Sequence, residues 1–339
     1  MNLRICIVAL VGLTTCLSAA PAGAVVGGER VALETVPWFA PVASCGGTLV
    51  TPDRLLTAAH CVGGMSPSQV GQTAVGGQVR TITHVALHPG HRAKNGQNFL
   101  DDVAIVTLDQ PVVGVTPVTL GEATGPARIV GMGFGLAPGT GHREAEILTS
   151  GGLRQATLRQ LSDRECAAAF ARNRPGTGER FDAARMRCAV DVDGREPLSS
   201  GCFGDSGGPL VVGLDSAPVQ VGVVSWGGDK CGADHSPSVF ADVNRSLDFI
   251  LDPDPVWAPT RTVSVTVTGT RTLRCSASGR EPGTTLTYTW KRRSHGRGLH
   301  VVGTGRTHRP TSSGRFYCFV TASNAGGELL AGVDNVLRQ

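Results

Sequence analysis

The chain of 339 residues is 17% charged and 41% hydrophobic, and it carries a formal net charge of +4 at pH 7. Such a length accommodates two or three domains, each able to bury a core. After the first residues, no segment reaches the roughly 18 uninterrupted apolar residues needed to cross a bilayer, which excludes a transmembrane segment in the mature protein.

The first 24 residues have the pattern of a secretory signal peptide. A charged start and a short apolar run are followed by the small-residue sequence Ala22-Gly23-Ala24. We expect cleavage after Ala24 to give a secreted, extracellular protein that begins at Val25. A cut after Ala20 is the alternative, and it would leave Pro21 to Ala24 as a short pro-segment.

The cysteine content also indicates an oxidising compartment. Of ten cysteines, Cys6 and Cys16 lie in the signal region, and the remaining eight form an even set. Disulfides are the usual role of cysteine outside the cytoplasm. The spacings CxxC and HExxH do not occur, so we expect neither a metal site nor a cofactor.

Most of the first half of the chain consists of short β-rich runs, such as Val79–Thr83 and Val103–Leu108, separated by Gly, Pro and Asp. Many short strands with turns between them predict a β-sandwich or a β-barrel. The second half continues this pattern, apart from one short helix predicted at the capping box formed by Ser162 and Glu165.

A glycine-rich run from Gly201 to Pro209 has the composition expected of a nucleophile loop. Ser206 would attack a carbonyl only if a base removed its proton and hydrogen-bond donors held the resulting oxyanion. The glycines leave backbone N–H groups uncovered, and we expect those of Gly204 and Ser206 to form an oxyanion hole. A glycine-rich hairpin with an incidental serine is the alternative interpretation.

Three motifs together resemble the trypsin-like (chymotrypsin-fold) serine proteases: Thr57-Ala58-Ala59-His60-Cys61, Asp102 before an apolar strand, and Gly204-Asp205-Ser206-Gly207-Gly208-Pro209. The resemblance implies an all-β, double β-barrel domain over 25–251 and a serine endopeptidase that works through an acyl enzyme. It assigns Ser206 as nucleophile, His60 as general base and Asp102 as the acid that orients His60. Asp101 is then expected to be an ordinary solvated charge.

Two other function classes fit the sequence less well. The segment from Gly204 to Gly208 also satisfies the G-x-S-x-G pattern of α/β-hydrolases, but that fold places its acid and histidine after the serine. A catalytically silent, protease-like binding or adhesion protein is the second alternative. It is disfavoured because His60, Asp102 and Ser206 are all retained.

The resemblance also implies contacts that brace the site. As a freed amino terminus, Val25 would pair with a buried Asp205 and order the oxyanion loop. The segment Ser225-Trp226-Gly227 would form an edge to which an extended substrate adds as a strand. The disulfides that the resemblance implies are Cys45–Cys61, Cys166–Cys188 and Cys202–Cys231.

The resemblance further implies which residues determine primary specificity. Ser200 takes the position of the pocket floor, where trypsin-type enzymes carry an aspartate. Gly227 leaves one wall of the pocket open, and Ser238 narrows another. We expect a neutral pocket that prefers Leu, Met, Tyr or Phe, because a Lys or Arg would be desolvated there without a partner. A shifted alignment that brings Asp229 or Asp234 to the pocket would restore a basic preference.

The composition changes after residue 251. Residues 252–259 are rich in proline and predict a stiff linker. Residues 260–339 contain alternating strand patterns, and their Cys275, Trp290 and Cys318 resemble the core of an immunoglobulin-like β-sandwich, in which the two cysteines pair.

Positive charge is concentrated in this C-terminal part. Residues 260–339 contain twelve Lys and Arg against three acids, a balance of +9, so the rest of the chain sums to −5. Four of these cations lie in one predicted loop, Lys291 to Arg297. We expect the module to be a tether for a polyanion or a cell surface, separate from the catalytic machinery.

Overall fold

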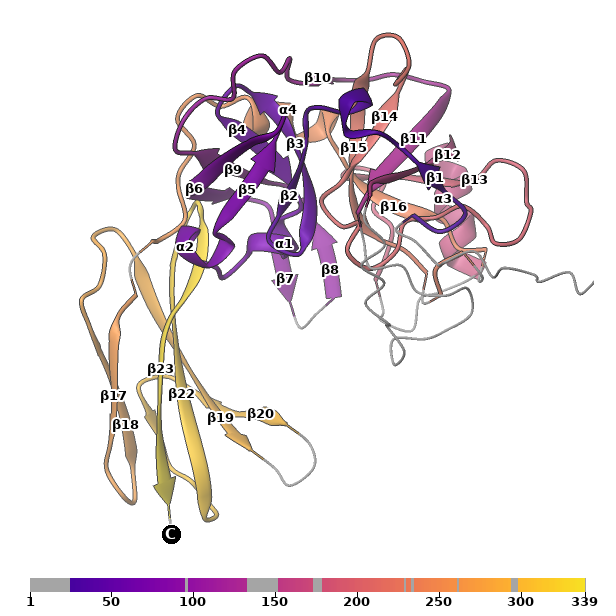
Figure 1. Ribbon diagram of the computed structural model, residues 1–339. Coiled ribbons are helices and arrows are strands. Elements are labelled where there is room, and N and C mark those ends of the chain that lie inside the picture. The colour runs from indigo at the N-terminus through magenta and orange to yellow at the C-terminus, as the bar shows by residue number, and fades with distance from the viewer. Residues whose placement is uncertain are drawn as a thin grey trace, which may run out of the picture.

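The computed structural model describes residues 25–94, 97–132, 152–172, 179–228, 230–232, 235–260, 262–293 and 298–338. The predicted signal peptide (1–24), Asp229 and Asp234 lie outside these ranges. Two β-barrels lie side by side, and an elongated C-terminal region extends from the first of them (Figure 1). Within the described ranges, no helix is long and apolar enough to cross a membrane.

The first barrel consists of six antiparallel strands, which are in spatial order β2 (Phe39–Val42), β3 (Cys45–Thr51), β4 (Arg54–Thr57), β9 (Ala104–Leu108), β6 (Gln78–Leu87) and β5 (Gln72–Val75). The Thr73 hydroxyl of β5 donates to the Pro41 carbonyl of β2 at 2.6 Å and links the two ends of this sheet. The apolar run predicted at 103–108 forms the central strand β9, whose side chains are almost all buried because β4 and β6 flank it.

Short elements connect the strands of this barrel. They are a 3-10 helix (Leu33–Thr35), α1 (Ala59–Val62), α2 (Pro67–Val70), and the hairpin of β7 (Arg92–Lys94) and β8 (Gln97–Leu100). The α1 helix directly follows β4, and it carries His60 at the edge of the barrel.

The second barrel contains β12 (Arg154–Gln160), β11 (Pro126–Gly131), β14 (Pro209–Val212), β15 (Val219–Trp226), β16 (Ser238–Asp242) and β13 (Met186–Asp191), and pairing of β12 with β13 closes it. Two short strands extend this sheet, β1 (Glu29–Arg30) on β12 and β10 (Thr119–Leu120) on β15. The predicted capping box opens α3 (Asp163–Arg172), where the Ser162 N–H donates to the Glu165 carboxylate at 2.8 Å. A 3-10 helix (Asn244–Ser246) and α4 (Leu247–Ile250) follow the barrel.

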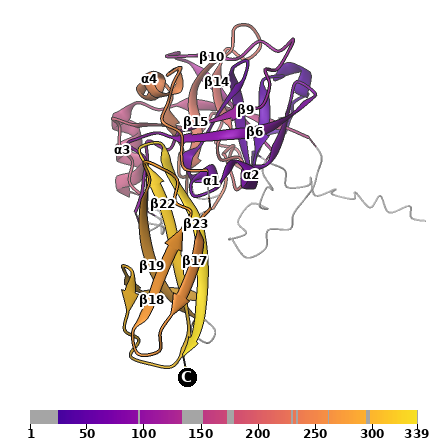
Figure 2. The same ribbon diagram turned by 90° about the vertical axis from the view of Figure 1, so that its left-hand side faces the viewer.

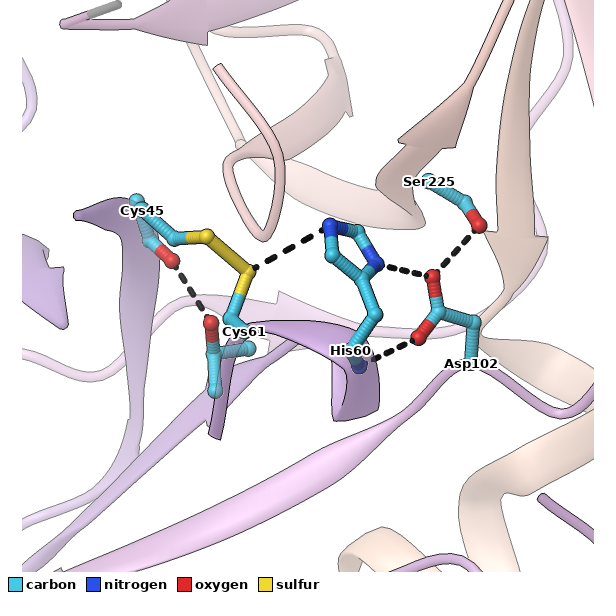
Figure 3. The surroundings of a disulfide bond; sticks show 7 residues. Cys45, His60, Cys61, Asp102 and Ser225 are labelled. Atoms are coloured by element: carbon cyan, nitrogen blue, oxygen red, sulfur yellow. Dashed lines mark hydrogen bonds and ion pairs between the residues drawn. A yellow bond between two sulfur atoms is a disulfide. The ribbon is translucent and has the colours of Figure 1, made fainter. Parts of the chain in front are cut away.

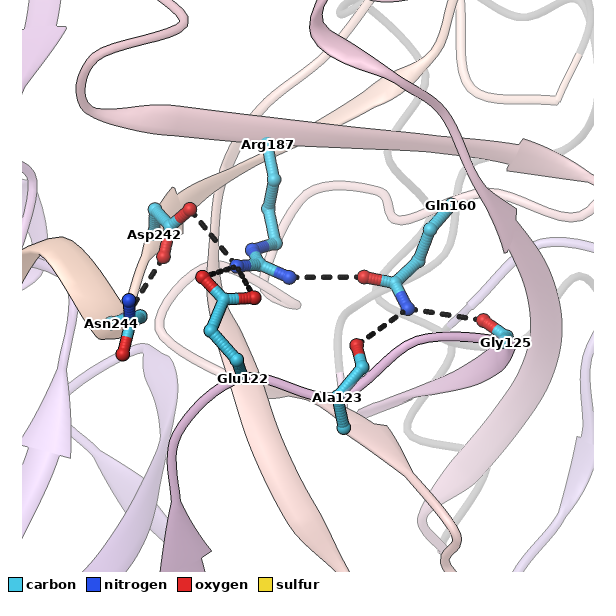
Figure 4. Close-up of polar contacts among 7 residues, drawn as sticks. All are labelled: Glu122, Ala123, Gly125, Gln160, Arg187, Asp242 and Asn244. Carbon is cyan, nitrogen blue, oxygen red and sulfur yellow. Dashed lines mark hydrogen bonds and ion pairs between the residues drawn. The ribbon is translucent and has the colours of Figure 1, made fainter.

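A polar cluster centred on Arg187 lies where β12, β13 and β16 meet (Figure 4). The guanidinium of Arg187 donates to the Asp242 carboxylate at 2.9 Å and to the Gln160 side-chain oxygen at 3.0 Å. The Glu122 carboxylate forms a longer ion pair with the same guanidinium, at 3.4 Å. Because Arg187 and Asp242 are nearly buried, each charge is tolerated only with the other as its partner.

Glycines permit a close approach where the two barrels meet. Gly207 has a φ of +76°, and a Cβ there would lie 2.3 Å from both the Gly46 carbonyl oxygen and the Thr57 hydroxyl oxygen. The Gly46 N–H also donates to the Ser206 carbonyl at 2.8 Å. Only glycine fits at position 207, and its presence brings the nucleophile loop of the second barrel against β3 of the first.

The C-terminal region contains two sheets, one of β17 (Ser264–Thr268), β18 (Leu273–Ser278) and β21 (Thr307–His308), and one of β20 (Leu299–Thr304), β19 (Thr285–Arg293), β22 (Gly314–Asn324) and β23 (Gly327–Arg338). The Cys275–Cys318 disulfide joins the sheets, and the fully buried Trp290 lies in the same apolar core. Figure 2 shows that the long β22–β23 hairpin reaches the first barrel.

Candidate active site

A buried hydrogen-bond network joins His60 and Asp102 (Figure 3). His60 Nδ1 lies 2.7 Å from Asp102 Oδ2, and the backbone N–H of His60 donates to the other carboxylate oxygen at 2.8 Å. From the second barrel, the Ser225 hydroxyl donates to Asp102 Oδ2 at 2.6 Å. Asp102 is completely buried and follows Asp101, whose φ of +44° turns the chain just before β9. The two barrels therefore meet directly at this carboxylate.

The network changes the proton affinity of both members. Burial alone would lower the pKa of His60, but the charge and hydrogen bond of Asp102 outweigh it, so the pKa of His60 is raised above 6.5. Burial would raise the pKa of Asp102, yet the His60 charge and the hydrogen bonds from His60 and Ser225 lower it below 3.8. Asp102 is therefore ionised at neutral pH, and it stabilises a positive charge on His60.

The other side of the imidazole is packed by the Cys45–Cys61 disulfide and an aromatic ring. His60 Nε2 lies 3.7 Å from the sulfur of Cys61, and the Phe99 ring contacts the imidazole edge-on at a centroid distance of 5.0 Å. In the described part of the chain, the group spaced closely enough to hold a metal ion is Cys45, His60 and Cys61. Its two sulfurs are bonded to each other, so they cannot act as thiolate ligands.

Ser206 lies across a cavity of about 350 Å³ that His60 also lines. Within the described ranges its hydroxyl makes no hydrogen bond, so the structure places the serine in the same cavity as His60 without linking the two side chains. Such contacts are often long before substrate binds and shorten in the complex. The cavity is therefore lined by a serine hydroxyl and an imidazole, and it has room for a further side chain.

The loop before Ser206 is held by Asp205, whose side chain is completely buried. Its Oδ2 accepts hydrogen bonds from the Val25 nitrogen at 3.0 Å and from the Cys202 N–H at 2.9 Å. Gly204 has a φ of +87°, and neither its N–H nor that of Ser206 has an acceptor among the described residues. Two donors next to the serine are therefore available to an oxyanion.

The predicted pocket residues divide between two cavities. Ser225, Trp226, Gly227 and Ser238 line the cavity of Ser206, whereas Ser200 lines an adjoining cavity of about 140 Å³. Ser200 also pairs with Val26, since its N–H donates to the Val26 carbonyl at 3.1 Å. The Ser238 hydroxyl oxygen accepts from the Gly201 N–H at 3.1 Å and fixes one wall.

Several residues at the site were missed or misjudged from the sequence. Phe99, Phe203 and Glu179 also line the cavity of Ser206, and Glu179 is a nearly buried carboxylate. The expectation that Asp101 is solvated is wrong, because its side chain is only 11% exposed and accepts from Arg185 at 3.0 Å. The sequence Asp101-Asp102 before an apolar strand indicated that Asp102 is buried. It gave no sign that Asp101 would also be largely buried and paired with Arg185.

The four disulfides of the structure are the pairs that the sequence analysis names, Cys45–Cys61, Cys166–Cys188, Cys202–Cys231 and Cys275–Cys318. The first joins the histidine motif, through Cys61, to β3, and the third joins the segment before Ser206 to the rim of its cavity. These cross-links hold the loops around the cavity in place.

Comparison with known proteins identifies the family. A family model described as Trypsin matches residues 25–250. A trypsin from Saccharopolyspora erythraea is 31% identical over 251 residues, which cover 67% of this chain and 97% of that protein. Human transmembrane protease serine 5 is 31% identical over 252 residues, 68% of this chain and 52% of that protein. Among solved structures, neuropsin, a serine protease of mouse brain, is similar with a TM-score of 0.53 and 26% identity over 66% of this chain and 96% of that chain. The chain therefore belongs to the trypsin family of serine proteases and is a serine endopeptidase.

Proposed function

We propose that this endopeptidase uses His60, Asp102 and Ser206 as its catalytic triad. The observation that supports the proposal best is that His60, which is hydrogen-bonded to the buried Asp102, lines the same cavity as Ser206. The alternative of a silent binding protein gains no support from this geometry, because a buried Asp102 would be costly to keep without a function for the pair.

In the proposed mechanism, Ser206 attacks the scissile carbonyl while His60 takes its proton. Asp102 stabilises the imidazolium that forms, and it is itself held by Ser225. The free N–H groups of Gly204 and Ser206 bind the oxyanion. His60 then protonates the leaving amine, and water releases the acyl group by the same steps in reverse.

Secretion and activation form a second part of the proposal. Cleavage after Ala24 would turn the Val25 nitrogen, which lies 3.0 Å from the buried Asp205 carboxylate, into an ammonium. The resulting buried ion pair would be stronger than the hydrogen bond and would fix the oxyanion loop. We therefore propose a signal peptide over 1–24 and a protease that needs no further cut.

The cavity supports a preference for neutral residues before the cut. The walls beside Ser206 are formed by Gly201, Val224, Gly227 and Ser238, none of which carries charge. A Cβ on Gly227 would have no neighbour closer than 3.7 Å, so this wall is open. Glu179 also lines this cavity, and Glu179→Gln would measure how far its carboxylate affects this preference.

For the C-terminal region we propose an immunoglobulin-like sandwich over 260–339, joined by a linker over 252–259 to the protease domain at 25–251. The two sheets, the Cys275–Cys318 bond and the buried Trp290 support it. The balance of +9 supports contact with a polyanion. Salt-sensitive retention of the full chain on heparin would test that contact.

The decisive test is digestion of a mixed peptide library with purified protein and with Ser206→Ala. The wild type should cut mostly after Leu, Phe, Tyr or Met, and the variant should lose at least about 10³-fold in kcat because its nucleophile is gone. Persistent cleavage by Ser206→Ala would refute the triad.

A further inference from the structure

A second cavity, of about 600 Å³, lies between the first barrel and the tip of the β22–β23 hairpin. We call it the accessory groove. The barrel contributes His60, Gly63 and His88 to its walls, and the hairpin contributes Ser323, Ala325 and Glu328. His60 also lines the cavity of Ser206. The groove therefore opens next to the catalytic histidine.

Main-chain hydrogen bonds fix the hairpin to the barrel beside this groove. The Gly64 N–H donates to the Glu328 carbonyl at 3.0 Å, and the Leu330 N–H donates to the Gly64 carbonyl at 3.1 Å. The Leu87 N–H of β6 donates to the Gly326 carbonyl at 2.7 Å. Gly64 lies four residues after His60, so these hydrogen bonds fix the position of the hairpin relative to the catalytic histidine.

The linker strengthens this attachment. The Trp257 ring packs against His84 at a centroid distance of 5.2 Å, and the guanidinium of Arg54 lies 5.7 Å from its ring centroid. The Ala258 N–H donates to the Val85 carbonyl at 2.7 Å, and the Asn324 side chain donates to the Trp257 carbonyl at 2.8 Å. The C-terminal region is thus attached along a surface, and not by the linker alone as a free tether would be.

Among the three acids of residues 260–339, only one has a carboxylate left for a ligand. Glu281 accepts from the Thr260 N–H at 2.9 Å, and Asp334 accepts from the Val267 N–H at 2.8 Å. The Glu328 carboxylate is exposed and has no partner among the described residues. It lies in the wall of the accessory groove, whose lining contains no Lys or Arg.

His88 does not cancel this charge. Burial lowers the pKa of His88 below 6.5, despite the nearby Asp101 carboxylate, and the neighbouring His91 and Arg185 lower it further. His88 is therefore neutral at pH 7. Glu328 is the carboxylate that a ligand in the groove would meet.

We propose that the accessory groove binds an extended stretch of the polypeptide substrate, and that Glu328 favours a Lys or Arg residue in that stretch. This inference rests on the proposed peptidase mechanism. The C-terminal region would then help to select substrates, in addition to any contact with anionic surfaces. The occupant is the substrate because His60 lines both the groove and the cavity of Ser206.

The test uses two sets of peptides with the full-length protein, one with Leu and one with Arg before the cut. In each set a single Lys or a single Gln is placed in turn at four positions on either side of the cut. The wild type should prefer Lys over Gln at one position by about two- to fivefold in kcat/KM, the range of an exposed ion pair. Glu328→Gln should abolish this preference, and Glu328→Lys should reverse it.

Controls separate this inference from the mechanism. Glu34→Gln removes an exposed carboxylate that does not line the groove, and it should keep the Lys preference. Ala325→Trp at the exposed hairpin tip should slow cleavage of the long peptides several-fold and leave a short chromogenic substrate unchanged. An unaltered Lys preference in Glu328→Gln would overturn the groove assignment. Equal activity of the wild type and Ser206→Ala would instead overturn the triad.

Discussion

The junction between the two barrels and the junction between the first barrel and the C-terminal region are built from different contacts. At the first, functional side chains meet: the Ser225 hydroxyl of one barrel donates to the Asp102 carboxylate of the other at 2.6 Å. At the second, the hairpin is joined to the barrel by main-chain hydrogen bonds, such as those between Gly64 and the hairpin. Changing one side chain at the first junction should therefore remove a group of the site, whereas the hairpin contacts should be sensitive mainly to changes in backbone spacing.

The two junctions also differ in what they hold. In the proposed mechanism the barrel junction positions groups that change charge during the reaction, and the fully buried Asp102 gives them surroundings of low dielectric. The hairpin junction positions a wall of a groove, and it leaves Glu328 exposed to solvent. Substitutions at the barrel junction should therefore lower the rate of cleavage strongly, and substitutions at the hairpin junction should lower it only modestly.

The largest expected effect is that of Asp102→Asn, which should lower kcat by about 10⁴-fold. An amide cannot stabilise the imidazolium, and it holds His60 in the wrong tautomer. Steady-state kinetics on a short peptide substrate would measure the loss. The matched control is Asp101→Asn, because Asp101 pairs with Arg185 instead of His60. Similar losses in both variants would show that the acid has been misassigned.

The pH profile should show the next largest effect. Because only neutral His60 accepts the serine proton, kcat/KM should rise about tenfold per pH unit on the acid side. The midpoint should lie above 6.5, since Asp102 raises the pKa of His60. A midpoint below 6.5 would mean that burial outweighs the Asp102 charge.

The same pKa shifts predict opposite effects on stability. A raised pKa of His60 stabilises the folded state fully below pH 6.5, and this contribution is lost as the pH rises through the raised value. The lowered pKa of Asp102 stabilises the folded state above pH 3.8, and that contribution is lost as the pH falls through the lowered value. Denaturation curves measured at a series of pH values should show the free energy of unfolding falling as the pH rises above 6.5 and falling again as the pH drops below 3.8.

The contrast between the junctions also explains what the sequence could predict. The barrel junction depends on residues within short motifs, so the grouping of His60, Asp102 and Ser206 could be proposed before the fold was known. The strand pattern likewise predicted a β-sandwich or a β-barrel, and the family resemblance implied two barrels. These features are local in the chain, and each is marked by particular side chains.

Features that depend on distant contacts were not predictable. Glu179 reaches the cavity of Ser206 from a segment after α3 that has no motif of its own. Ser200 occupies the expected place in sequence, but it lines the adjoining cavity and pairs with Val26, a contact that the motif does not indicate. The sequence Asn324-Ala325-Gly326-Gly327 indicates a hairpin turn, yet main-chain hydrogen bonds to another part of the chain leave no side-chain signature.

The hairpin junction should be sensitive to the size of residue 326. A Cβ on Gly326 would lie 1.8 Å from the Val256 carbonyl oxygen, so Gly326→Ala must displace the hairpin or the linker. We expect a loss of about 1–3 kcal/mol in the free energy of unfolding. Hydrogen exchange of the Leu87 and Gly64 amides should accelerate, because their acceptors lie in the hairpin.

The neighbouring change Ala325→Ser serves as the control, because Ala325 is exposed at the tip of the hairpin. It should alter neither amide exchange nor stability. Normal exchange at Leu87 and Gly64 in Gly326→Ala would show that the attachment does not depend on this close contact. A thousand-fold loss of activity on a short peptide would contradict the separation of the two junctions.

The smallest expected effect concerns selectivity within the cavity of Ser206. Ser238 is buried in its wall, and its hydroxyl oxygen accepts from the Gly201 N–H at 3.1 Å. Ser238→Gly removes the side chain and widens the cavity, so the ratio of kcat/KM for Phe over Leu substrates should rise by up to about tenfold. Ser200→Ala is the control, since Ser200 lines the adjoining cavity and should leave that ratio unchanged. If Ser200→Ala shifted the ratio more than Ser238→Gly did, substrate side chains would reach Ser200, and the floor would lie where the family resemblance first placed it.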